Sequence, residues 1–174
     1  PWTETYRPDL TPGWIAPGND PAVDEYIRRQ TMTARDYRAF ITRLRVAYPD
    51  DSFLIVRFGD HQPALSHRIL DPAAKPGQLA RRLMAYDPRY YATYYAIDTI
   101  NFAPADTSSA LAMLDAAYLP IAVQEAAGLP LDPSFAAQKA MMLRCNGLFY
   151  ACNGGQEARR LNRLLKDAGL IKNL

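Results

Sequence analysis

The sequence lacks any long uninterrupted run of apolar residues, and this absence excludes a bilayer-spanning helix within it. The longest candidate extends from Ala110 to Ala127, but Asp115 and Pro120 interrupt it. Roughly 20 predominantly apolar residues in succession are needed to cross a bilayer. We therefore expect this segment to be a helix of a water-soluble fold.

The sequence also lacks an excess of charge of either sign. Its 20 Lys and Arg residues nearly balance 18 Asp and Glu residues, which leaves a formal net charge of +2. The arginines are scattered rather than massed, so nucleic acid is not an expected partner. With 174 residues, of which 49% are hydrophobic, the chain has the size and composition of one globular domain, residues 1–174, with a substantial core.

Cysteine is scarce, because only Cys145 and Cys152 occur. On one continuous helix these residues would lie about 10 Å apart at 1.5 Å rise per residue, which is too far for a disulfide. If Asn146 and Gly147 end the helix, the two cysteines can pair. We expect two buried free thiols, and the pair does not by itself settle the redox compartment.

No initiator methionine and no signal peptide precede Pro1. We interpret the chain as a piece of a longer protein, with any membrane anchor or targeting segment upstream. Residues 1–21 are rich in proline and glycine, which predicts an irregular surface arm pinned to the body by Trp14.

One stretch combines a strand-like segment with side chains able to bind a metal. Residues 53–58, five of them large and apolar, are typical of a strand buried on both faces of a parallel sheet. Gly59 then allows a sharp turn, and Asp60 and His61 follow it. Ligands of open α/β sheets bind beyond the carboxyl ends of strands, and aspartate oxygen and imidazole nitrogen are good ligands for divalent metals. The alternative is a turn in which Asp60 only caps the next segment.

The rest of the sequence predicts helices and one further strand. Two consecutive helices are expected from Pro21 onward, the second opened by Thr33. Tyrosine-rich residues 90–102 predict a long strand. Further helices are expected at 78–85, 106–127 with a kink at Pro120, 133–143, and 157–168 with its leucines inward. The fold class predicted is mixed α/β, in which helices flank both faces of a small, partly parallel sheet with residues 53–58 at its centre.

The segment Phe-Gly-Asp-His-Gln-Pro at residues 58–63 resembles the second metal-binding motif of the alkaline phosphatase superfamily. Sulfatases and the lipid-head-group transferases related to lipoteichoic acid synthase are the most similar members. The resemblance implies that Asp60 and His61 bind a catalytic divalent metal, which is Mn²⁺, Mg²⁺, Ca²⁺ or Zn²⁺. It implies the C-terminal part of an alkaline-phosphatase-like catalytic domain that cleaves or transfers a sulfate or phosphate ester, as a phosphoglycerol or phosphoethanolamine transferase does. The substrate would be a small or lipid-linked ester.

Two further residues are candidates for substrate contact. In the transferase-like relatives a substrate-binding histidine stands just before a Pro-aromatic pair, which Pro1-Trp2 resembles, so Trp2 is one candidate. His67, six residues beyond His61, is the other, and an ordinary surface role is its alternative. Ester cleavage also needs a nucleophile. No early strand followed by a Thr- or Ser-bearing helix N-terminus precedes Gly59, so we expect no catalytic nucleophile in this chain and little activity from it alone.

These expectations extend to the parent protein and its assembly, and two alternative functions remain. The parent protein is expected to be membrane-anchored, with this domain on the periplasmic or extracellular side. A piece of a larger sheet leaves a strand edge open, so a homodimer is possible. One alternative is a non-catalytic interaction or regulatory module with a degenerate Asp-His pair. The other, a cysteine hydrolase, is disfavoured because neither cysteine stands at a helix N-terminus beside a positive charge.

Overall fold

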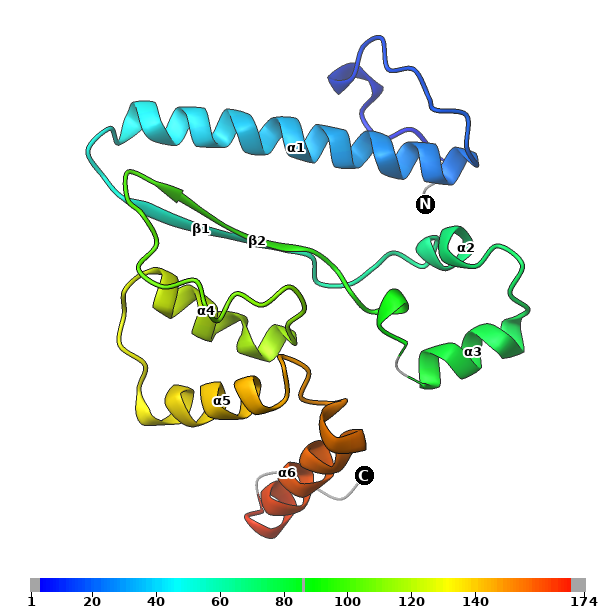
Figure 1. The fold of residues 1–174 in the computed structure, drawn as a ribbon. Coiled ribbons are helices and arrows are strands. Elements are labelled where there is room, and N and C mark those ends of the chain that lie inside the picture. The colour runs from blue at the N-terminus through cyan, green and yellow to red at the C-terminus, as the bar shows by residue number, and fades with distance from the viewer. Residues whose placement is uncertain (1–3, 86, 170–174) are drawn as a thin grey trace. The chain divides into compact units, whose positions relative to one another are not determined.

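The computed structural model describes residues 4–85 and 87–169, and they form a mixed α/β fold, as the sequence predicts. Figure 1 shows the elements along the chain. The helices are α1 (Pro21–Ala47), α2 (Ser66–Leu70), α3 (Pro76–Met84), α4 (Leu119–Ala126), α5 (Pro133–Arg144) and α6 (Gln156–Asp167), and the strands are β1 (Phe53–Phe58) and β2 (Tyr95–Ile100). Short 3-10 turns are η1 (Pro8–Leu10), η2 (Pro88–Tyr90), η3 (Ala116–Tyr118) and η4 (Cys152–Gly155).

The sheet contains two antiparallel strands, β1 and β2, in the part of the chain that is described. The amide of Gly59 donates to the carbonyl of Tyr94 at 3.0 Å, which places the end of β1 beside the start of β2. The prediction of a partly parallel sheet is therefore wrong for these residues, and a sheet of this size gives no support to an alkaline-phosphatase-like fold. An apolar run shows that a strand is favoured, but it does not set the direction of the neighbouring strand.

The side chains of β1 are half-buried along the strand, and Phe58 is 60% exposed. The expectation of burial on both faces is therefore not met. The strand predicted for residues 90–102 is also shorter than expected. Tyr90 belongs to the turn η2, and β2 begins only at Tyr95. Asp87 and Pro88 explain the late start, because the Asp87 carboxylate accepts from the amide of Arg89 and a proline in the first turn favours the 3-10 conformation.

The chain divides into two compact units. The first comprises the described residues up to Ser52 together with Arg57–Ala96, and the second comprises Phe53–Val56 together with the described residues from Ile97 onward. Each is described by itself below.

In the first unit, α1 is one helix of 27 residues where the sequence predicts two. The Asp20 carboxylate caps its start by accepting from the amide of Ala22 at 3.0 Å, with Pro21 in the first turn. Thr33 does not open a second helix, because its hydroxyl donates to the carbonyl of Arg29 at 3.0 Å, one turn earlier. A Thr hydroxyl satisfied in this way is compatible with a continuing helix.

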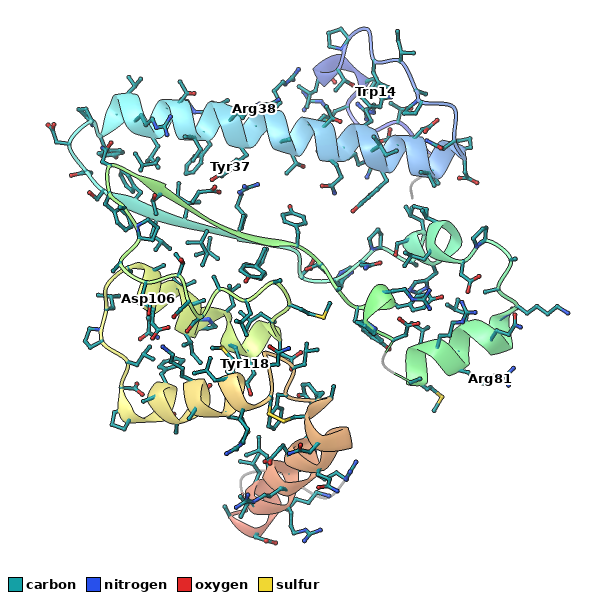
Figure 2. All side chains as sticks on the ribbon, viewed as in Figure 1. Trp14, Tyr37, Arg38, Arg81, Asp106 and Tyr118 are labelled. Atoms are coloured by element: carbon teal, nitrogen blue, oxygen red, sulfur yellow. A yellow bond between two sulfur atoms is a disulfide. The ribbon has the colours of Figure 1, made fainter. Side chains whose placement is uncertain are left out.

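An ionic network binds the N-terminal arm to α1. Arg28 is 2% exposed. Its guanidinium donates to the Glu25 carboxylate at 2.8 Å, to the Thr11 hydroxyl at 2.5 Å and to the carbonyl of Tyr6. The amide of Tyr6 in turn donates to Glu25 at 3.0 Å. The arm is irregular, as expected, and it places half-buried Trp14 near α1 (Figure 2).

The second unit contains the main apolar cluster of the described residues. Tyr118, Ile121 and Met142 are buried, and partly buried residues from the same unit pack against them: Leu114, Leu131, Phe135, Met141 and Phe149. The cluster joins η3 and α4 to α5, and Figure 2 shows Tyr118 between these helices. The boundaries of α5 and α6 lie within a residue of the predicted ones. In α6, however, Leu161 is 43% and Leu164 55% exposed, so the prediction that both point inward is wrong.

The helix predicted for residues 106–127 is replaced by a loop, η3 and the shorter α4. The Asp106 carboxylate, labelled in Figure 2, accepts from the amide of Ser108 at 2.8 Å and so stabilises a turn, not a helix start. Pro120 does not kink a long helix, because α4 begins at Leu119 and Pro120 lies in its first turn, where no backbone donor is needed. Among the described residues no helix is both long and apolar enough to cross a membrane.

Cys145 and Cys152 form a disulfide, so the prediction of two free thiols is wrong. Helix α5 ends at Arg144, and Asn146 and Gly147 both take positive φ, 49° and 79°. This reversal brings the two Cα atoms to 5.1 Å, within the usual range for a disulfide. A Cβ at position 147 would lie 2.4 Å from the carbonyl oxygen of Met113, so only glycine fits there.

Candidate functional site

The end of β1 is fixed by its contacts with the residues that lead into β2. The Thr93 hydroxyl donates to the Gly59 carbonyl at 2.7 Å, beside the Gly59–Tyr94 backbone hydrogen bond. A Cβ at position 59 would lie 2.9 Å from the Thr93 Cβ, so glycine is required by close approach. The chain therefore leaves the strand at a defined point, and Asp60 and His61 follow at once.

Asp60 and His61 are both open to solvent, with side chains 82% and 77% exposed. The Asp60 Oδ1 atom accepts from the amide of His61 at 2.9 Å, which holds the carboxylate against its own turn. The Asp60 Oδ2 atom lies 3.5 Å from His61 Nε2. The structure thus brings the two predicted metal ligands together on one turn at the carboxyl end of β1.

The hydrogen bond of the His61 ring assigns its tautomer. Nδ1 lies 3.0 Å from the carbonyl oxygen of Gln62. A carbonyl can only accept, so Nδ1 carries the proton and, in the neutral ring, Nε2 presents a lone pair. That lone pair faces an oxygen of the Asp60 carboxylate, which is also an acceptor. Two acceptors so placed can share a metal ion, and both are also open to solvent.

The spacing of the two atoms suits a shared metal. Ligand atoms about 2.1 Å from Zn²⁺ at tetrahedral angles are roughly 3.4 Å apart, which is close to the 3.5 Å that separates Asp60 Oδ2 and His61 Nε2. Metal-binding histidines also donate their other ring N–H to a carbonyl or carboxylate, as His61 does to Gln62. The residues present therefore fit one half of a divalent metal site.

The part of the chain that the structure describes brings no third ligand to the pair. Within the described residues no group of three or more His, Cys, Asp or Glu side chains could hold a metal ion. His67 lies on α2, where its ring meets the edge of the Tyr90 ring at 5.4 Å between centroids. Trp2, the other candidate for substrate contact, lies outside the described residues.

Gln62 is a functional candidate that the sequence interpretation missed. Its side-chain amide donates to the carbonyls of Arg89 at 3.0 Å and of Ala92. These partners stand 27 and 30 residues further along the chain, so no local pattern marks the contact. The available signal was only its position between the Asp-His pair and Pro63.

A polar cluster supports the turn η2 in the same unit. The Tyr90 hydroxyl accepts from Arg82 at 3.2 Å and donates to Asp71 at 3.3 Å, and Arg82 also forms an ion pair with Asp71. Tyr90 is 4% exposed. Hydrogen bonds from Arg89 lower the pKa of Asp87, whose carboxylate caps η2. These groups bond to one another, so the role of the cluster is to stabilise the turn η2.

In the described part of the second unit, a hydroxyl side chain lies near a carboxylate and an amine. The Ser109 hydroxyl donates to Glu125, which also accepts from Lys139 at 2.5 Å. Ser109 is 1% exposed, so a substrate cannot reach its oxygen. The three residues instead connect the loop after β2 to α4 and α5. Asp115 is likewise structural, because its carboxylate accepts from the amide of Phe149 at 2.6 Å.

Comparison of the chain with protein-family models, curated proteins and solved structures yielded no match.

Proposed function

We propose that Asp60 and His61 are two ligands of a divalent metal centre that serves the cleavage or transfer of a sulfate or phosphate ester. The remaining ligands and the nucleophile come from outside the described residues. The proposal rests on the resemblance of residues 58–63 to the metal-binding motif of the alkaline phosphatase superfamily and on the geometry of the pair.

One observation carries the proposal. His61 Nδ1 donates a hydrogen bond to the Gln62 carbonyl, and Nε2 faces Asp60 Oδ2 at 3.5 Å. Solvent could satisfy the two exposed side chains separately, yet their ligand atoms lie side by side. As a pair of metal ligands it has the correct tautomer, the correct spacing and an open approach.

A divalent metal held there supplies Lewis-acid polarisation of an ester oxygen. This chain's own contribution is to bind and orient: Asp60 supplies a negatively charged oxygen, and His61 supplies a neutral nitrogen on a turn fixed by Gly59. A set that mixes imidazole with carboxylate favours Zn²⁺ or Mn²⁺ over Mg²⁺ and Ca²⁺, which prefer oxygen ligands throughout.

The disulfide adds support for where the parent protein works. Disulfides persist in oxidising surroundings and are rare in the cytosol. The Cys145–Cys152 bond is therefore consistent with a membrane-anchored parent whose catalytic domain lies on the periplasmic or extracellular side.

The chain carries a built-in control for a metal-binding experiment, because His61 and His67 are its only histidines. In an NMR titration with Mn²⁺, the paramagnetic ion should broaden the ring signals of His61 at concentrations that leave those of His67 sharp. Binding should be weak, since two ligands do not make a closed site. His61→Ala assigns the signals, and Asp60→Ala should abolish the selective broadening. Equal broadening of both histidines, or of neither, contradicts the metal assignment.

Activity in the longer protein gives the second test. Asp60→Ala and His61→Ala should each lower turnover of a sulfate or phosphate ester by at least about a hundredfold, because metal polarisation contributes several kcal/mol and each 1.36 kcal/mol is tenfold in rate. Melting temperatures should change little, since both side chains are exposed. His67→Ala should lose far less. A folded Asp60→Ala protein with normal activity would favour the non-catalytic module instead.

A further inference from the structure

The side chain of Gln62 attaches the turn that carries Asp60 and His61 to residues near the start of β2. Both hydrogens of its amide group are used, one for the carbonyl of Arg89 at 3.0 Å and one for the carbonyl of Ala92. Residue 62 is half-buried, whereas its two predecessors are exposed. Gln62 is therefore where the exposed turn meets the folded body.

The two carbonyls that accept from Gln62 lie in or next to the turn η2, which backbone hydrogen bonds close. The amides of Tyr90, Tyr91 and Ala92 donate back to Asp87 and Pro88 at 2.7–3.1 Å, which closes the turn η2. The Tyr90 side chain beneath this turn is held by Asp71 and Arg82. The segment that carries the two acceptor carbonyls is thus held by other hydrogen bonds, so their contact with Gln62 can fix the position of residue 62.

The backbone of Gln62 acts on the metal ligand directly. Its carbonyl oxygen accepts a hydrogen bond from His61 Nδ1 at 3.0 Å. The side chain of Gln62 thus fixes the place of the residue, and the carbonyl of the same residue sets the orientation and tautomer of the imidazole. If the carbonyl moved away, the hydrogen bond from Nδ1–H would be lost. The neutral ring could then adopt the other tautomer, in which Nε2 carries the proton and has no free lone pair.

We propose that Gln62 is a positioning residue, which holds its own carbonyl against His61 Nδ1 and thereby keeps His61 Nε2 free to bind a metal beside Asp60. This inference rests on the proposed function for its purpose, although its geometric part can be measured without metal. Partners of this outer kind typically change metal affinity 10- to 100-fold when they are removed.

Gln62→Met is the matched substitution, because it keeps the length of the side chain and removes both donors without adding charge. Gln138→Met is the control, since Gln138 lies on the exposed side of α5 in the other unit. Gln62→Asn keeps the amide on a side chain that is one methylene shorter, so it should fail to reach the two carbonyls. If the methionine variant does not fold, the tautomer and the Mn²⁺ affinity are measured in Gln62→Asn instead.

Two readouts separate the inference from the proposed function. The ¹⁵N shifts of the His61 ring, measured without metal in the chain as it stands, report the tautomer. The Mn²⁺ titration described above reports affinity. We expect Gln62→Met to change His61 from the Nδ1–H form to a mixture and to weaken Mn²⁺ binding by about tenfold. The Gln138→Met variant should match the wild type in both measurements, and the His67 shifts should not move in any variant.

Each other outcome is decisive. If Gln62→Met leaves the tautomer and the Mn²⁺ affinity unchanged, the positioning role is wrong. If the tautomer changes but wild-type protein shows no selective Mn²⁺ effect at His61, Gln62 does position the ring and the metal function fails. If the affinity falls while the tautomer stays fixed, Gln62 acts by some route other than its carbonyl, which overturns the inference.

Discussion

The two units of this chain are stabilised by different kinds of contact. In the first, the buried groups that connect the arm to α1 are charged: Arg28 and Glu25 are both nearly inaccessible and bond to each other and to backbone atoms of the arm. In the second, buried Tyr118, Ile121 and Met142 form an apolar cluster, and a disulfide lies close by in sequence. The stability of the first unit should be sensitive to the loss of a buried charge, and that of the second to the loss of buried side-chain volume.

The largest effect is expected from Arg28→Ala. It leaves the Glu25 carboxylate buried without its main partner, and breaking a buried pair on one side costs about 3–5 kcal/mol. Both tryptophans of the chain, Trp2 and Trp14, are in the first 14 residues, so tryptophan fluorescence during denaturation reports this unit. Arg38→Ala, on the exposed part of α1 (Figure 2), should change the unfolding free energy by less than about 0.5 kcal/mol. Equal effects of the two substitutions would show that the network is not stabilising.

Met142→Ala should have the next largest effect, and in the second unit. Met142 is fully buried, and removing a buried methionine side chain costs about 2–5 kcal/mol through lost burial and the remaining cavity. Amide hydrogen exchange in α4 and α5 should accelerate. Met84→Ala, at a position 81% exposed, is the matched control and should be near neutral. If Met142→Ala leaves exchange in α4 and α5 unchanged, the apolar cluster does not hold this unit together.

Loss of the disulfide should lower the free energy of unfolding by a somewhat smaller amount. The loop-entropy estimate for a ring of about eight residues is about 2.5 kcal/mol, and Cys145→Ser with Cys152→Ser removes it. The loop has other supports, because the Asp115 carboxylate accepts from the amide of Phe149 and the Asp115 amide donates to the carbonyl of Gly147. Thermal denaturation with and without reductant measures the effect. Equal melting temperatures of the wild type with and without reductant would show that the disulfide does not stabilise the chain.

The mildest test is acid. The side-chain hydrogen bond from Arg28, with further bonds from the amide of Tyr6 and from Arg29, lowers the pKa of Glu25 to about 2 from an ordinary 4.5. Between these values the unfolded chain binds more protons, so stability is full above about pH 4.5 and falls as the pH drops toward 2. The slope for one proton is at most about 1.4 kcal/mol per pH unit. Glu25→Gln should flatten the fall that tryptophan fluorescence reports, whereas Met142→Ala should leave its slope unchanged.

Prediction from the sequence succeeded where one local pattern decides the structure. Residues 53–58 form a strand because large apolar and β-branched side chains favour it. Helix α5 begins at Pro133 as expected, and the Asp132 carboxylate caps it by accepting from the amide of Phe135. It failed where distant residues decide. The direction of β2, the exposure of Leu161 and the pairing of Cys145 with Cys152 depend on contacts, or on positive φ angles at Asn146 and Gly147, that hydrophobic periodicity does not encode.

The candidate site divides in the same way. Asp60 and His61 could be identified because they are adjacent to each other and follow a strand. Gln62 and Thr93 could not, because their contacts join residues 27 to 34 positions apart. Hydrogen bonds of this kind leave no periodic trace in one sequence. His67 is close to the pair in sequence, and its ring contact is with Tyr90.

The disulfide between Cys145 and Cys152 closes a covalent ring, so α5 and α6 are joined both by the backbone and by the sulfur bond. Tyr150 lies inside the ring and is 70% exposed, so a protease that cuts after aromatic residues can reach it. A cut there would not release anything, because the sulfur bond still ties α6 to α5. The nicked protein would migrate as one species on a non-reducing gel and as two after reduction, so the C-terminal helix would survive a break in the backbone beside it.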